Sequence, residues 1–197
     1  MLEKNYKGEN MEKMTFYLVL MLVLLILIIW FVKISNKFNR YQVIIEESKK
    51  NVDIYLGKRY DTICEMIKVT KSFARHEKGV FSDVMKSRAN SSIEGFNKTM
   101  YSQDKTIKKI FALAEAYPEL KSSEEFLNLQ EQIDEENEEL AAAKRIVNSN
   151  ISKLNQDIVS FPNSIIAGMK GLKKANFLYE EDIERKRSIS DFDYEVK

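Results

Sequence analysis

The residues whose types could support chemistry are few in this chain. His76 is the only histidine, and on a helix its neighbour Glu77 would point about 100° away, so a metal ion would find no second ligand there. Cys64, the only cysteine, lies in an apolar stretch that is typical of a small buried hydrophobe, and it can form no intramolecular disulfide. We therefore expect a turn or capping role for the histidine and a structural role for the cysteine.

Two denser motifs also lack the spacing of a known site. The acidic run Glu131 to Glu139 has neither the oxygen-ligand spacing nor the glycine turn of a calcium loop. It therefore predicts a solvated helix face, which could meet the Lys and Arg residues of the first two helices. The segment Gly168 to Gly171 lacks the spacings of a P-loop and of a dinucleotide fingerprint. We expect no catalytic residue, no cofactor and no metal site, and a chain that is not an enzyme.

A third polar motif, Lys58 to Asp61, interrupts an apolar stripe between Leu56 and Ile63. It could form a buried ion pair with the acidic run, or it could be an exposed helical turn. A structural role is favoured over a binding role for either arrangement. If the turn is exposed, replacing Arg59 with Ala should barely change thermal stability.

The rest of the chain is organised around the apolar run Met14 to Val32, which contains no charge, glycine or proline. Its 19 residues would span about 28 Å as a helix, close to the ~30 Å of a bilayer's hydrocarbon core. The run is longer than a signal peptide's apolar core, and no small-residue cleavage site follows it. We predict an uncleaved transmembrane helix over residues 14–32, preceded by a short tail of residues 1–13.

Flanking charges bear on orientation and on partners. Positive residues are fewer before the run than within about 20 residues after it, which favours a cytoplasmic C-terminal domain at the cell membrane and leaves the extracytoplasmic side as the alternative. The residues counted are Lys4, Lys7 and Lys13 before the run, and Lys33, Lys37, Arg40, Lys49 and Lys50 after it. The net charge of +1 gives no bias toward nucleic acid.

Hydrophobic spacing after the run predicts an all-α fold. Apolar residues recur at intervals of three, four and seven, so one helix is expected from Met14 to Ala74, a second from Val80 to Ala116 and a third from Ser123 to Ser160. The third helix carries a heptad made of Phe126, Ile133, Leu140, Val147, Leu154 and Phe161. A short fourth helix, or two half-turns, is expected within residues 163–178.

The matched lengths of the three long helices predict an antiparallel bundle over residues 33–178. In this topology the turn at residues 76–79 is distal to the membrane, the turn at residues 117–121 lies near the bilayer, and the third helix ends at the distal tip. The last residues, 179–197, are charged and without periodicity, which predicts a polar, mobile tail.

Five blocks, in this order, resemble the LemA family of bacterial membrane proteins. They are Lys58 to Glu77 (KRYDTICEMIKVTKSFARHE), Ala116 to Leu120 (AYPEL), Phe126 to Gln130 (FLNLQ), Ala141 to Arg145 (AAAKR) and Ser160 to Met169 (SFPNSIIAGM). The resemblance covers residues 14 to 180 and implies a single-pass anchor that carries an antiparallel helical bundle. It implies no established enzymatic activity. The chain departs from the family pattern at Thr62 to Cys64 and at Ile146 to Val147, where the family has more apolar or aromatic residues.

We therefore expect a membrane-anchored scaffold or adaptor of the cell envelope that binds a protein partner through its distal tip. The candidate surface consists of Arg75, His76, Lys78, Pro162, Ile166 and Lys170, which converge in the antiparallel topology. Lateral self-assembly into a homo-oligomer, through unfilled apolar heptad positions, is the alternative. A small-ligand-binding bundle or an enzyme is less favoured, because the heptad shows no convergent polar groups.

Overall fold

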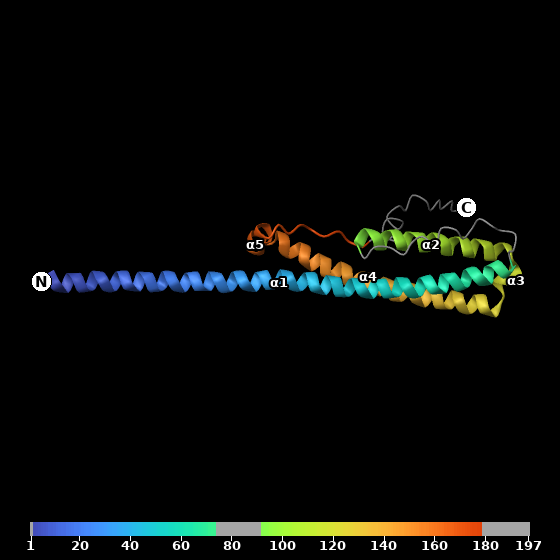
Figure 1. Cartoon of the computed structure of the whole chain (residues 1–197), viewed down its shortest axis with the longest axis horizontal. Helices are drawn as coiled ribbons and strands as arrows, with labels where there is room; N and C mark the ends of the chain where they lie inside the picture. Colours follow the sequence, from blue (N-terminus) through green and yellow to red (C-terminus); the bar gives the residue numbers. More distant parts are fainter. Residues whose placement is uncertain (1, 74–91, 179–197) are drawn as a thin grey trace, which may run out of the picture. The chain divides into compact units, whose positions relative to one another are not determined.

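Helix α1 (Leu2–Phe73) places the apolar run and the first helix of the bundle on one continuous helix of 72 residues (Figure 1). The computed structural model describes residues 2–73 and 92–178. No proline interrupts α1, and Gly57 lies within it without breaking it, at a cost of about 1 kcal/mol relative to alanine. The helix ends one residue before the predicted Ala74, so the long first helix is confirmed, but it begins at Leu2 rather than at the predicted Met14 and includes most of the predicted N-terminal tail.

Four shorter helices follow within the described residues: α2 (Ile93–Ala116), α3 (Pro118–Lys121), α4 (Glu124–Val159) and α5 (Asn163–Met169). Ser92 caps α2 by accepting a hydrogen bond from the backbone N–H of Gly95 at 3.0 Å. Pro118 begins α3, which explains why α2 stops just before it. The described residues contain helices and no strand, so the all-α fold class is confirmed.

Contacts within the chain divide it into two compact units, which share α1 and α4. In the larger unit, residues 45–152 with 175–178, one apolar cluster joins the last turns of α1, the last turns of α2, the short helix α3 and the first turns of α4. Its buried members are Ile63, Met66, Ile67, Val69, Ile107, Ile110, Ala114, Leu120, Phe126, Leu129 and Ile133. The C-terminal ends of α1 and α2 therefore meet at the N-terminal end of α4.

This packing corrects the predicted topology. Helix α4 is antiparallel to α1, as Ser48 faces Asn150 and Thr62 faces Glu136. Helix α2, in contrast, is parallel to α1, and the predicted placement of the turn at residues 117–121 is wrong, because this turn lies beside the C-terminal end of α1. The prediction failed because α2 has 24 residues rather than 37. The 19 residues from 74 to 92 can reach about 60 Å, which is enough to begin α2 at the other end of its neighbour.

The smaller unit comprises residues 2–44 and 153–174. Here Ile34 and Phe38 of α1 are buried, as are Ile166 and Ala167 of α5. The Nζ atom of Lys170 donates to the backbone oxygen of Ser35 at 3.2 Å and to Oδ1 of Asn39 at 2.9 Å. The segment that follows α4 therefore lies against α1 just after the apolar run, and the prediction that it reaches the turn after α1 is wrong.

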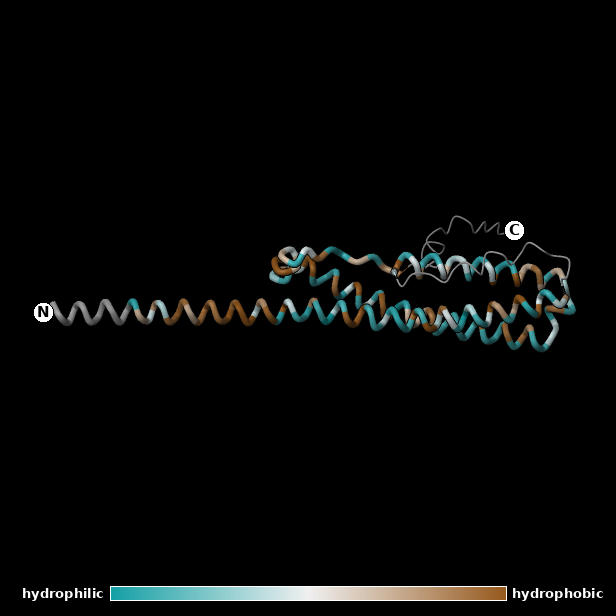
Figure 2. Tube along the Cα trace, viewed as in Figure 1, coloured by the Kyte–Doolittle hydropathy of each residue, from teal (hydrophilic) through white to brown (hydrophobic). Residues whose placement is uncertain are grey.

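Within the part of the chain that the structure describes, the apolar run is exposed along almost all of its length. Figure 2 shows it as a continuous hydrophobic stretch of α1. Within the described residues, α1 is the one helix long and apolar enough to cross a membrane, and none of its most apolar window is buried. The predicted turn at residues 76–79 and the predicted tail at residues 179–197 lie outside the described residues.

Candidate functional site

The most concentrated polar feature of the larger unit is a groove between α1 and α4. Its lining residues recur at i, i+3, i+4 and i+7 on both helices, so each helix turns one face to it. They are Lys58, Asp61, Thr62 and Glu65 of α1, and Gln132, Glu135, Glu136 and Glu139 of α4, around a volume of about 400 Å³. We call this feature the acidic groove, because it carries five carboxylates and one ammonium group.

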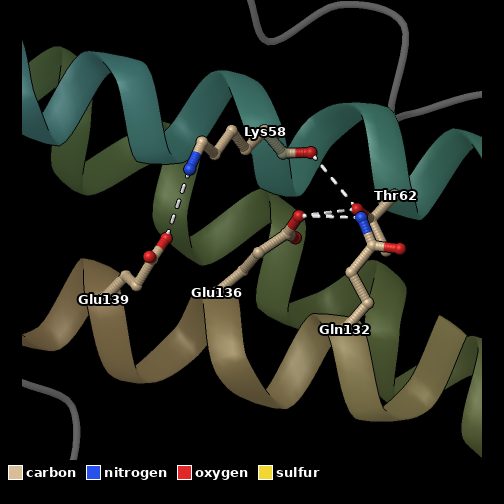
Figure 3. Close-up of polar contacts among 5 residues, drawn as sticks. All are labelled: Lys58, Thr62, Gln132, Glu136 and Glu139. Atoms are coloured by element: carbon tan, nitrogen blue, oxygen red, sulfur yellow. Dashed lines mark hydrogen bonds and ion pairs between the residues drawn. The ribbon is translucent and has the colours of Figure 1, made fainter. Parts of the chain in front are cut away.

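Glu136 forms the floor of the acidic groove. Its side chain is only 6% exposed. Its Oε1 accepts a hydrogen bond from the Thr62 hydroxyl at 2.8 Å and one from the Gln132 amide at 3.4 Å (Figure 3). Its Oε2 has no hydrogen-bond donor among the described residues. A buried carboxylate oxygen without a donor costs free energy, and a cationic group that entered the groove would remove that cost.

The rim of the groove is exposed and charged. Lys58 Nζ lies 3.5 Å from Glu139 Oε2, and both side chains are about half exposed, so this pair contributes little to stability. A second hollow of about 350 Å³ shares Glu135 with the groove and is lined by further acids of α4, Glu131, Asp134 and Glu138. The negative surface thus continues along the outer face of α4, as expected for a solvated acidic run.

Arg59 resolves the alternatives left open for the motif at residues 58–61. It is 4% exposed and forms an ion pair with Asp104 of α2, so the buried ion pair is confirmed and the exposed turn is wrong for this residue. The partner belongs to α2, however, and not to the acidic run of α4. Gln103 completes the contact: it accepts from Arg59 at 3.4 Å and donates to the backbone oxygen of Leu56 at 2.9 Å.

The residues predicted to form a partner surface are not brought together by the described structure. Arg75, His76 and Lys78 lie outside the described residues. Pro162 is half-buried, Lys170 is bonded to α1, and Ile166 is fully buried and therefore offers no surface in the folded chain. The smaller unit holds the latter three, at α5 and the turn before it.

The heptad of Phe126, Ile133 and Leu140 does not account for the acidic groove. The buried face of α4 has a second seam, made of Leu129, Glu136 and Ala143. These three residues also recur every seven positions, three after the main heptad. A glutamate in such a seam is the signal that would have found the site.

A separate polar cluster holds the smaller unit together. Lys37 Nζ lies 2.8 Å from Asp157 Oδ2, and the Asn163 amide donates to the other carboxylate oxygen at 2.9 Å. Burial alone would raise the pKa of Asp157, but its contacts with Lys37 and Tyr41 outweigh burial and lower that pKa. The hydrogen bond to Asp157 raises the pKa of Lys37. Among the residues described, no group of three His, Cys, Asp or Glu side chains could hold a metal ion.

These features define an all-α helical-bundle protein with a helix near its N-terminus that could span a membrane. The model of the LemA family matches residues 48–192, which is most of the chain. The protein therefore belongs to the LemA family, as its sequence blocks indicate. A comparison with curated proteins gives no match.

Proposed function

We propose that this LemA-family protein is a membrane-anchored, non-enzymatic scaffold or adaptor, and that the acidic groove binds a lysine- or arginine-bearing segment of a protein partner. The observation that carries the proposal is Glu136, which lines the groove and whose buried Oε2 has no hydrogen-bond donor among the described residues. Anchoring is supported by the exposed apolar run of α1, which has the length of a bilayer's hydrocarbon core.

Charge complementarity favours a basic partner. Four carboxylates besides Glu136 line the groove, and Lys58 provides the one compensating positive charge. An arginine guanidinium can donate two parallel hydrogen bonds to a carboxylate, and a partly buried pair of this kind is screened less by salt than an exposed one. For a partner segment held in this way, contacts with the exposed rim would add little to the affinity, and the contact with Glu136 would add most.

Site-specific photocrosslinking in the host cell tests the partner. The photoreactive residue replaces Asp61 in the groove, with Glu94 of α2 as an exposed acidic control position. We expect a crosslinked partner from position 61, a basic crosslinked peptide by mass spectrometry, and loss of the product in Glu136→Gln but not in Glu138→Gln. An equal product in both variants would refute the groove as the binding site. A second copy of this chain as the product would favour lateral self-assembly instead.

We further propose that the C-terminal side of α1 faces the cytoplasm, since five Lys and Arg follow the run within about 20 residues and three precede it. Ser149, an exposed residue of α4, can be replaced by Cys in a Cys64→Ser background. A membrane-impermeant maleimide should then label the protein only after cell lysis. Labelling of intact cells would place the larger unit outside, and release from membranes by alkaline extraction would argue against an anchor.

A further inference from the structure

We propose that the turn after α4 and helix α5 form a second contact with the membrane, in which Phe161, Ile165 and Met169 enter the boundary between headgroups and acyl chains, and nearby lysines bind anionic headgroups. This inference rests on the proposed anchoring by α1. It concerns only the smaller unit, residues 2–44 and 153–174.

The apolar residues form one exposed face. Ile165 and Met169 lie four apart on α5 and so share one face, and Phe161 lies in the turn just before α5; their exposed fractions are 52%, 71% and 83%. The opposite residues, Ile166 and Ala167, are buried. Val159 adds a further exposed apolar side chain at the end of α4. A segment of this kind, apolar on the outside and fixed to the protein on the inside, matches helices that lie in a membrane interface.

The contacts of Lys170 place α5 at the level of the headgroups. Its partners Ser35 and Asn39 follow the last residue of the apolar run, Val32, by three and seven residues. On a helix these intervals correspond to about 4.5 Å and about 10 Å beyond the hydrocarbon core. The headgroup layer extends about 5 to 8 Å beyond that core on each side. A chain anchored through residues 14–32 therefore holds α5 beside the membrane surface.

The charge of the same region favours anionic lipid as the occupant. Residues 33–44 and 153–174 contain a single acidic residue, Asp157, which is already paired with Lys37. Their basic residues are Lys33, Lys37, Arg40, Lys153, Lys170, Lys173 and Lys174. These two segments carry seven positive charges and one negative charge, whereas the net charge of the whole chain is only +1. Positive charge is therefore concentrated next to the anchor. Clusters of this size beside a membrane helix attract anionic headgroups.

An environment-sensitive fluorophore on single cysteines tests the contact in the full-length chain. In a Cys64→Ser background, Ile165→Cys reports α5, Leu24→Cys reports the anchor, and Val43→Cys is an exposed apolar control further along α1. The protein is reconstituted in equimolar phosphatidylcholine and phosphatidylglycerol, with nitroxide-labelled lipid as quencher. We expect severalfold stronger quenching at position 165 than at position 43, with a blue-shifted emission.

The outcomes separate this inference from the anchoring on which it rests. Quenching at position 24, with position 165 no more quenched than position 43, would overturn the α5 contact and leave the anchor intact. No quenching at position 24 would overturn both. Replacing Lys173 and Lys174 with Gln should reduce quenching at position 165, whereas Lys98→Gln on α2 should not. Quenching that is equal in phosphatidylcholine alone would refute the anionic headgroups as ligands.

Discussion

Two adjacent residues of α1, Lys58 and Arg59, show how strongly the role of a charge depends on its burial. Both form ion pairs with another helix, but Lys58 is half exposed and Arg59 is buried beside Asp104 and Gln103. Removing one member of a buried pair leaves the other charge without its partner in a poorly solvated place. The same substitution at a solvated pair removes a weak contact.

Arg59→Ala should therefore lower the free energy of unfolding by about 3 kcal/mol, at the low end for buried pairs because Asp104 is partly solvated. Lys58→Ala should lower it by about 0.5 kcal/mol. Chemical denaturation of the detergent-solubilised chain, followed by circular dichroism, compares them. Equal small losses would mean that the Arg59 pair does not stabilise the folded state.

Glu136 lies in a seam that is otherwise apolar. An apolar residue at this position would favour the stability of the folded chain, whereas the proposed binding role requires the carboxylate. Glu136→Leu fills the seam between Leu129 and Ala143 and removes the unsatisfied carboxylate oxygen. We expect the variant to be more stable by about 1 kcal/mol while losing the partner crosslink at position 61. Thermal melting and crosslinking are measured on the same preparations. A destabilised variant would show that the bonds of Glu136 to Thr62 and Gln132 outweigh its burial.

The Lys37–Asp157 pair gives the smaller unit a pH dependence. The lowered pKa of Asp157 means that its stabilisation is present above the ordinary carboxyl pKa of about 3.9 and is lost as the pH falls through the folded-state value. The raised pKa of Lys37 means that its stabilisation is present below about 10.4 and is lost as the pH rises further. The pair therefore stabilises the unit from about pH 4 to about pH 10.

Lys37→Met should raise the pKa of Asp157, because burial would then be opposed by fewer hydrogen bonds. The accompanying loss of stability at neutral pH should stay below about 1 kcal/mol, since Lys37 is half exposed. NMR titration of the aspartate carboxyl carbons measures the shift. Lys33→Met, one turn earlier on an exposed position, is the control, and an equal effect there would exclude the direct pairing.

At the scale of elements, the heptad of α4 predicted most of its buried face. Phe126, Ile133, Leu140, Val147 and Leu154 are buried as expected. Phe161 has the same spacing but is exposed, because the helix ends at Val159 and the chain turns before the next heptad position. Periodicity predicts a face only while the helix continues, and the predicted helix end at Ser160, one residue from the observed end, already precedes Phe161.

Two isoleucines of α4 provide a matched test of this face. Ile133 is fully buried in the apolar cluster, whereas Ile146 is 54% exposed on the same helix. Ile133→Ala should cost about 2 to 5 kcal/mol, through lost burial and the cavity that remains. Ile146→Ala should change stability by less than about 0.5 kcal/mol. Urea unfolding measures both, and similar losses would contradict the orientation of α4.

The direction of α2 could not be predicted from hydrophobic spacing. Spacing identified the face made by Ile107, Ile110 and Ala114, but the same face packs equally well in a parallel or an antiparallel pair. The choice depends on the length of the connection before Ser92, and an assumed short loop gave the wrong answer. The partner of Arg59 was missed for the same reason, since Asp104 reaches it only when α2 runs parallel to α1.

At the scale of the whole molecule, two compact units with separate buried residues predict separate local stabilities. Phe38→Ala removes a buried ring from the smaller unit and should increase amide hydrogen exchange over residues 153–169. Ile63→Ala, in the cluster of the larger unit, should instead increase exchange over residues 107–133. Mass spectrometry resolves the two regions. A rise in both regions from either variant would show that the units unfold together.

The bond between Lys170 and Ser35 joins residues that are 135 positions apart in the chain. At a synthesis rate of about 5 to 20 residues per second, Ser35 leaves the ribosome about 7 to 27 s before its partner does. During that interval α5 and the end of α4, which belong to the same compact unit as Ile34 and Phe38, have not yet been made. These two side chains are buried in the finished fold and at this stage lack that burial. The apolar run beside them is already available for the bilayer. With the proposed anchoring, insertion of the apolar run precedes completion of the smaller unit, and the newborn chain must protect these two side chains by other means until its last quarter is made.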